Sequence, residues 1–239
     1  MELYKILNDF TLENSTRRQN LGDENPLVAL QEPPQEFVDV AKAILSGHFH
    51  VTTINDERRI YPTCVEFYYH EEQDNGVKDP IVYHRNHKKI SGDDMPNVFS
   101  LGVLHNHVSG IDITFEKKAN AANKIVTGIV RASALIREFM VKDKDGNIIK
   151  VVKNGKEIDK DDRSTYLYQA LFGQFSIFDG FTIKWVDGKA EDFDSIKLQC
   201  CRRKNVMKYR EPQDGELDFQ KTAQKCERLW QFTINKSNK

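Results

Sequence analysis

Apart from its start, this chain carries most of its apolar residues in stretches typical of β-strands, and this limits the fold more than any other feature. The segments 48–54 and 60–70 are rich in β-branched and aromatic residues, and the polar turn N-D-E-R-R separates them. Similar stretches cover 98–104 and 124–136, and F-T-I-K-W-V at 181–186 predicts a further strand. The chain is therefore expected to build a sheet.

The clearest hairpin signal spans residues 135–158. A strand-type run ending in E-F-M-V-K is followed by the turn D-K-D-G-N and then by I-I-K-V-V-K, with N-G-K closing the second arm. The pattern predicts two long paired strands.

Helical signals are few. Phe37, Ala41 and Ile44 recur at helical spacing, Pro34 stands near the start of this run, and Gly47 can end it.

A second helix is predicted through T-Y-L-Y-Q-A-L-F, where Ser164 or an aspartate just before it can cap the start and Gly173 the end. No repeat is visible and no linker divides the chain. We expect one α+β domain, dominated by strands, over residues 35–239, preceded by a polar N-terminal extension over residues 1–34.

Composition limits the class of protein. The chain has 239 residues, of which 39% are hydrophobic and 30% charged, as in a globular protein. Its formal charge of −1 means that a nucleic-acid binder would need its basic residues gathered on one face. No apolar run is long enough to span a bilayer, and the four cysteines form no C-x-x-C pair, so we expect reduced thiols, a cytoplasmic location and no membrane partner.

Residues 65–70, V-E-F-Y-Y-H, crowd a carboxylate, three aromatic rings and an imidazole into one short stretch. In a strand, Glu66, Tyr68 and His70 share one face, and Val65 and Phe67 mark the other as the core face. One interpretation is a solvated strand face. The other gives Glu66 the task of activating a water, with Tyr68 beside it as a flat stacking surface.

The stretch L-H-N-H-V-S-G-I-D suggests a metal site as an alternative. His105 and His107 would lie on one face of a strand, with His84 or Asp112 as a further ligand. H-N-H-V-S-G also resembles part of the metal motif of JAMM-type isopeptidases, but the serine and aspartate that this motif requires further on are absent. Two polar histidines at a strand end are the simpler interpretation.

In chain order, short segments of the sequence resemble the alkyladenine (3-methyladenine) DNA glycosylase family. The segments that carry the resemblance are F-V-D-V-A-K-A-I-L-S-G (37–47), V-E-F-Y (65–68), P-I-V-Y-H-R (80–85), P-N-V-F-S-L-G-V-L-H (96–105), G-I-V-R-A (128–132), Y-L-Y-Q-A-L-F-G (166–173), F-D-G-F (178–181) and L-W-Q-F-T-I (229–234). Each motif is short and degenerate, but together they cover nearly the whole chain. The resemblance implies a curved, mostly antiparallel sheet with a few packed helices.

The resemblance also implies an activity. Such enzymes flip a damaged purine out of duplex DNA, stack it between aromatic rings and hydrolyse its bond to the sugar. Glu66 matches the general base, Tyr68 and His84 match base-contacting positions, and Arg131 matches an arginine of the base pocket or DNA backbone. No metal or organic cofactor is implied. The expected partner is duplex DNA, bound by a monomer.

The basic run that begins at residue 202 is either solvated surface or a nucleic-acid face. On the second interpretation, the DNA backbone contacts are Arg202, Arg203, Lys204 and Lys208.

Several positions depart from the family pattern. Gly102 and His105 stand where a stacking tyrosine and a tyrosine wedge are expected, so His105 becomes the candidate wedge. Asp112 replaces a pocket asparagine, which would put negative charge beside Glu66. An acidic insertion covers 71–79.

A register shifted by two residues would instead pair Glu66 with a non-catalytic glutamate of the family. Two alternatives therefore stay open beside base excision with an altered substrate range: a catalytically silent descendant that binds nucleic acid or another ligand, and the metal-dependent hydrolase.

Overall fold

The computed structural model describes residues 2–12, 33–71, 77, 79, 82, 98–107, 109–119, 128–153, 156–157, 164–173, 176, 178–203 and 228–234. Its helices are α1 (Glu2–Asp9), α3 (Gln35–Ser46), α4 (Leu167–Phe172), α5 (Ala190–Ser195) and the 3₁₀ turn η2 (Ser164–Tyr166). Its strands are β1 (His48–Thr52), β2 (Glu57–Glu71), β3 (Leu104–His107), β4 (Gly110–Thr114), β5 (Lys117–Ala119), β6 (Gly128–Asp143), β7 (Ile148–Ile149), β8 (Val152–Lys153), β9 (Lys156–Glu157), β10 (Thr182–Val186), β11 (Leu198–Cys201) and β12 (Gln231–Ile234).

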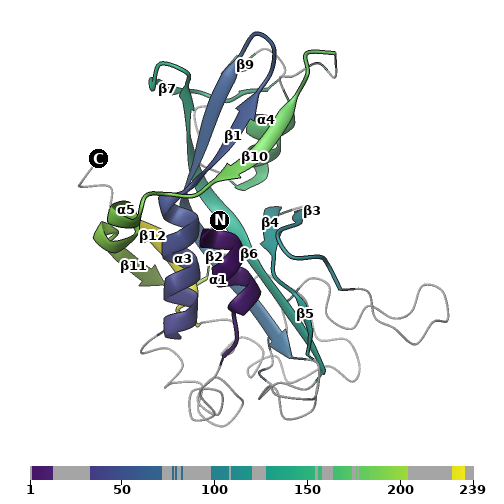
Figure 1. Cartoon of the computed structure of the whole chain (residues 1–239), viewed down its shortest axis with the longest axis vertical. Helices are drawn as coiled ribbons and strands as arrows, with labels where there is room; N and C mark the ends of the chain where they lie inside the picture. The colour runs from purple at the N-terminus through teal and green to yellow at the C-terminus, as the bar shows by residue number, and fades with distance from the viewer. Residues whose placement is uncertain are drawn as a thin grey trace, which may run out of the picture.

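The two longest strands, β2 and β6, form an antiparallel ribbon that runs through the molecule (Figure 1). They pair from Arg58 opposite Asp143 to Glu71 opposite Val130. The ladder is irregular just after Pro62, which has no N–H to donate, and then returns to its original register.

The other strands of the main sheet are short and attach to the edges of this ribbon. β1 and β12 pair with β2, and β4, β5 and β7 pair with β6. β10 extends the sheet beyond β1, β3 beyond β4, and β11 beyond β12, while β8 and β9 pair separately. All strand pairs of the described residues are antiparallel, and the sheet curls into a half-barrel.

Helix α3 covers one face of the ribbon, and α1 packs beside α3 (Figure 1). Phe37 of α3 stacks on Phe67 of β2 with ring centroids 4.9 Å apart, and on Phe10 at 5.5 Å. Trp230 meets the same Phe37 ring edge-on at 5.0 Å. Such aromatic pairs contribute about 0.5–1.5 kcal/mol each beyond their area burial. The cluster therefore ties four segments, distant in sequence, into one core.

The expected N-terminal extension over residues 1–34 begins with core residues. Helix α1 buries Leu3 and Leu7, and Phe10 and Leu12 are buried after it. The start of this segment therefore packs as part of the domain.

The expectation of an α+β fold with a curved antiparallel sheet and few helices is confirmed. The helix expected before Gly47 is α3, which buries Phe37, Ala41 and Ile44. The strands expected at 48–54, 60–70 and 181–186 are β1, β2 and β10.

The strand predicted at 98–104 is wrong, because β3 begins only at Leu104. Gly102 has φ +74° and donates its N–H to the carbonyl oxygen of Thr114 at 2.7 Å. The N–H of Thr114 in turn donates to the carbonyl oxygen of Val103. The N–H of Val103 donates to the carbonyl oxygen of Ser100, so residues 100–103 form a turn in place of the expected strand.

The hairpin predicted at 135–158 has the expected turn but not the expected second arm. Asp143 accepts the backbone N–H of Asn147, and Gly146 adopts φ +86° near the tip. Strand β7 is only two residues long, and the chain after it forms the separate pair β8–β9. Strand β6 has β2 as its long partner instead, a pairing that only the tertiary fold provides.

Two local predictions also differ from the structure. Ser164 lies in η2, and α4 starts after Tyr166 without a side-chain cap, while the aspartates before Ser164 lie outside the described residues. The strand predicted at 124–136 belongs to β6, which begins at Gly128; residues 121–127 lie outside the described part of the chain.

Replacing Gly110 with alanine is expected to destabilise the fold by about 2–6 kcal/mol in urea unfolding, because backbone strain and overpacking each cost roughly 1–3 kcal/mol. Gly110 has φ +137°, and an added Cβ would lie 2.8 Å from Cβ of Ser164 and 3.1 Å from Cδ1 of Leu135. Gly146→Ala is the matched control, since Gly146 also has positive φ but no atom within 4 Å of the added Cβ. Equal losses in the two variants would contradict the close approach at Gly110.

Candidate functional site

The stretch V-E-F-Y-Y-H alternates between two buried faces. Val65, Phe67 and Tyr69 belong to the core, as predicted. Glu66 lies on the other face and is fully buried, and Tyr68 is half-buried beside it. The interpretation of a solvated strand face is therefore wrong for Glu66.

A cross-strand row continues from Glu66 over five strands of the sheet. Glu66 lies opposite Gln231 of β12 and opposite Leu135 of β6. Leu135 lies opposite Asp112 of β4, and Asp112 lies opposite His105 of β3. Leu135 is fully buried yet outside the main core cluster, which agrees with its place on the face away from α3.

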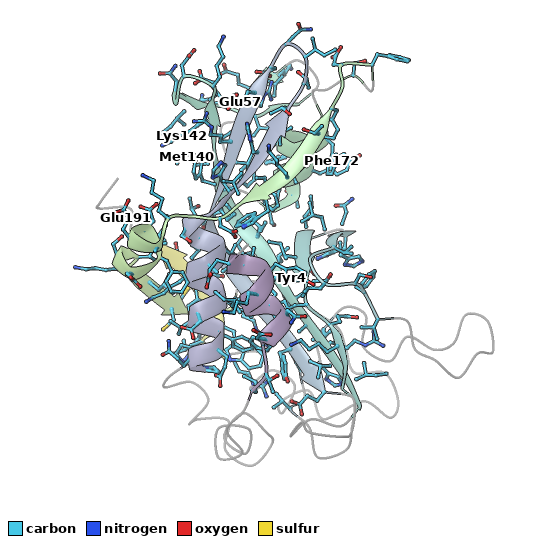
Figure 2. All side chains as sticks on the ribbon, viewed as in Figure 1. Tyr4, Glu57, Met140, Lys142, Phe172 and Glu191 are labelled. Carbon is cyan, nitrogen blue, oxygen red and sulfur yellow. The ribbon has the colours of Figure 1, made fainter. Side chains whose placement is uncertain are left out.

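Further polar residues lie beside this row, and we call the whole set the polar layer. It consists of Glu66, Tyr68, His70, His105, His107, Asp112, Thr114, Glu116, Arg131, Ser133, Arg137 and Gln231. At the far end of the ribbon, near β1 and β7, the labelled side chains Glu57, Met140 and Lys142 spread outward instead (Figure 2). The layer is thus confined to the half of the ribbon that carries β4 and β12.

Glu66 is held by an arginine that the sequence analysis did not single out. The guanidinium of Arg137 donates from Nε to Oε2 of Glu66 at 3.0 Å and from the terminal nitrogen to Oε1. The hydroxyl of Tyr68 also donates to Oε1. All three groups lie on the same face of β2 and β6. Both carboxylate oxygens of Glu66 are therefore engaged.

Burial and the Glu66 charge fix the protonation of these partners. Burial raises the pKa of Tyr68 well above its usual value, and the Glu66 carboxylate raises it further, so the phenol stays a donor. Burial alone would lower the pKa of Arg137, but the hydrogen bond to Glu66 outweighs it and the pKa lies above the usual arginine value. The guanidinium of Arg203 lies 5.4 Å from the centroid of the Tyr68 ring.

Asp112 has partners of a different kind. The hydroxyl of Ser133 donates to Oδ2 of Asp112 at 3.2 Å. Nε2 of His107 lies 3.2 Å from Oδ1, but the two atoms lack the alignment of a hydrogen bond. Nδ1 of His107 accepts the N–H of Ser109 at 3.2 Å, so Nε2 is the ring nitrogen that faces Asp112. The negative charge expected beside Glu66 lies two strand spacings away, roughly 10 Å between Cα atoms.

Arg131 lies in the polar layer but is already paired. Its guanidinium is buried and donates to Oε2 of Glu116 at 3.0 Å, and the N–H of Phe99 donates to the same oxygen. Arg131 therefore shares a face with Glu66 without contacting it in any described interaction.

The predicted DNA backbone contacts include one residue that the structure buries. Arg203 donates to both carboxylate oxygens of Asp79 and to the carbonyl oxygen of Phe67, so it closes the edge of β2 and is not exposed to a phosphate. Arg202 is exposed. Lys204 and Lys208 lie outside the described residues.

The two histidines of β3 lie on one face, as predicted. The ring of His105 is 5.6 Å from that of His107 and 4.5 Å from that of Phe99, between centroids. Among the described residues, no group of three or more histidine, cysteine, aspartate or glutamate side chains could hold a metal ion. His84, the predicted base-contacting residue and possible ligand, lies outside the described residues.

Sequence reasoning missed Arg137, Ser133 and Asp79. The signal for the first two was present, because Arg131, Ser133 and Arg137 lie an even number of residues apart within a largely apolar strand and so share one face. Asp79 gave no signal, since its role depends on Arg203, far away in the sequence.

No family model matches the chain, and neither a curated protein nor a solved structure matches it. None of the helices in the described ranges is long and apolar enough to cross a bilayer. What the chain does has to be inferred from the chemistry of the polar layer.

Arg137→Met is expected to lower the free energy of unfolding by about 3–5 kcal/mol, because it leaves the Glu66 carboxylate buried without its cation. The double variant Glu66→Gln/Arg137→Met, which removes both charges, should recover most of that loss. Urea unfolding of the four proteins of the double-mutant cycle measures this coupling.

Arg59→Met provides the control for this cycle. Arg59 pairs with Glu57, and both side chains are about one-third exposed, so we expect a loss of no more than about 1 kcal/mol. A loss at Arg137 as small as at Arg59 would contradict a buried ion pair.

Asp79→Asn is expected to destabilise the protein by about 3–5 kcal/mol at pH 7, because Arg203 is left buried without its carboxylate. Burial alone would raise the pKa of Asp79, but the charge and hydrogen bonds of Arg203 outweigh it, so the folded-state pKa is lowered. The contribution is therefore complete above the usual carboxyl pKa of about 3.9 and is lost as pH falls through the lower folded-state value.

Unfolding curves at pH 7 and pH 3 test this dependence. The stability difference between wild type and Asp79→Asn should be smaller at pH 3. The exposed Asp145→Asn is the control and should change stability by no more than about 0.5 kcal/mol at either pH. A difference that grows at pH 3 would contradict the direction of the shift.

Proposed function

We propose that this chain is a DNA N-glycosylase with a fold like that of the alkyladenine glycosylases. It would rotate a modified purine out of duplex DNA and hydrolyse the bond between base and sugar. The observation that supports this proposal is that residues assigned from the sequence share one face of the curled sheet. These residues are Glu66, Tyr68, His105, Asp112 and Arg131.

The chemistry of the layer suits this reaction. Hydrolysis of the glycosidic bond needs a carboxylate that orients a water and takes its proton, and the polar layer offers two buried candidates from the sequence prediction, Glu66 and Asp112. A buried carboxylate in a site with little water acts more strongly on developing positive charge than an exposed one. Tyr68 stays protonated and offers an aromatic ring next to the Glu66 carboxylate.

The DNA would approach along the β3 edge of the sheet. His105 lies on this terminal strand and is half-buried, which suits a side chain that inserts into a duplex. Arg202 is exposed and keeps its proposed role on the DNA backbone, whereas Arg203 is used within the fold.

Purified protein is expected to release alkylated purine from methylated duplex DNA in single-turnover assays. Glu66→Gln combined with Asp112→Asn should slow release by at least about 100-fold, because general-base catalysis contributes roughly 10²–10⁴. Chromatography of the released base measures this rate. Glu157→Gln, on an exposed side chain, should leave the rate unchanged.

Duplex binding by gel retardation at low and high salt completes the test, since phosphate contacts weaken as salt rises. A wild-type protein that neither releases base nor retards the duplex at low salt would contradict the proposed function.

A catalytically silent descendant of the same fold is the second candidate. It is favoured by one observation, namely that both oxygens of Glu66 are taken by Arg137 and Tyr68. This candidate predicts salt-dependent binding of duplex DNA by the wild type without any base release.

A further inference from the structure

The polar layer contains three buried carboxylates that differ in the charge of their partners. Glu66 pairs with the guanidinium of Arg137, and Glu116 pairs with that of Arg131. Asp112 has no arginine or lysine partner among the described residues; its contacts are the hydroxyl of Ser133 and the ring of His107. Asp112 is therefore the carboxylate of this set that has no permanent cation beside it in the described structure.

One oxygen of Asp112 also lacks an aligned donor. Asp112 is 3% exposed, and its Oδ1 is buried with no hydrogen-bond partner in the described structure. A buried polar atom left in this state costs free energy, and a catalytic role is one physical reason for a native structure to keep it. Oδ1 can accept a proton or a hydrogen bond without breaking an existing one, whereas Glu66 must first release Arg137 or Tyr68.

The position of Asp112 in the row favours the same carboxylate. His105, the proposed wedge, lies directly opposite Asp112 on the neighbouring strand and on the same face. Such cross-strand partners have Cα atoms about 4.5–5.5 Å apart. Glu66 lies two strands further from His105, roughly 10 Å more. A nucleotide displaced at His105 would thus lie closer to Asp112 than to Glu66.

We infer that Asp112, and not Glu66, is the general base of the proposed glycosylase reaction, with the hydroxyl of Ser133 as its hydrogen-bond donor and Glu66–Arg137 as a structural pair. The inference rests on the proposed function. The substrate is that of the proposed function, an alkylated purine, which is taken here in a cationic form.

The step balances without a cofactor. The C1′–N bond breaks and its electron pair leaves on the cationic base, which becomes neutral. The oxygen of a water bonds to C1′, and one water proton passes to Oδ1 of Asp112. The proton then returns to solvent.

Single-turnover base release by two variants tests the inference. Asp112→Asn keeps the shape of the side chain but cannot take the proton, so its release rate should fall by about 100-fold or more. Glu66→Gln/Arg137→Met removes the buried pair without stranding a charge, and it should lose less than about tenfold, below the usual contribution of a general base. Duplex affinity, measured by fluorescence anisotropy, should be retained in Asp112→Asn, because the lost group acts on the water.

The outcomes separate the two proposals. If the wild type releases base and the Glu66→Gln/Arg137→Met variant loses as much as Asp112→Asn, the role of Asp112 is overturned while the glycosylase function stands. If the wild type releases no base, both are overturned. If Asp112→Asn does not fold by circular dichroism, the pair variant decides alone: retained release supports Asp112, and lost release overturns it.

Discussion

The ladder between β2 and β6 is the constraint on which the rest of this structure depends. Every other strand of the main sheet is short and pairs with β2 or β6, either directly or through one intervening strand. Because side chains alternate across a strand, the ladder fixes two faces at once. One face buries the aromatic cluster around Phe37. The other face is buried as well, although much of it is polar.

A buried polar face is stable only if its charges are matched inside the protein. In the polar layer, Arg137 pairs with Glu66 and Arg131 pairs with Glu116. The edge of β2 uses the same device, with Arg203 against Asp79. In Glu66 the arginine and Tyr68 together engage both oxygens that a catalytic carboxylate would need. An acidic group without such a cation is then the one best suited to act on a ligand.

This difference between carboxylates with and without an arginine partner connects the proposed function with the role inferred for Asp112. A carboxylate paired with a guanidinium supports the geometry of the sheet, whereas Asp112 has a hydroxyl and an imidazole beside it and no guanidinium, which is the reason for proposing it as the base. The same reasoning applies to Arg203, which was predicted to contact the DNA backbone but forms a buried ion pair with Asp79. In the proposed complex, contacts with the duplex are assigned to exposed residues such as Arg202.

The sequence by itself determined the class of fold, α3, the strands β1, β2 and β10, and the separation of Glu66 and Tyr68 from the core side of β2. Local periodicity and the glycine after α3 carry this information, because they act within a few residues. The resemblance to the alkyladenine glycosylases also identified Asp112 as a position that differs from the pattern of that family.

Only the tertiary structure decided which residues meet across strands. The guanidinium on Glu66 comes from Arg137, 71 residues away in sequence, and that on Asp79 comes from Arg203, 124 residues away. In place of the strand predicted at 98–104 there is a turn at residues 100–103, whose backbone also bonds to Thr114 of another segment. Such contacts depend on strand register, which follows from burial of the whole sheet rather than from any short stretch of sequence.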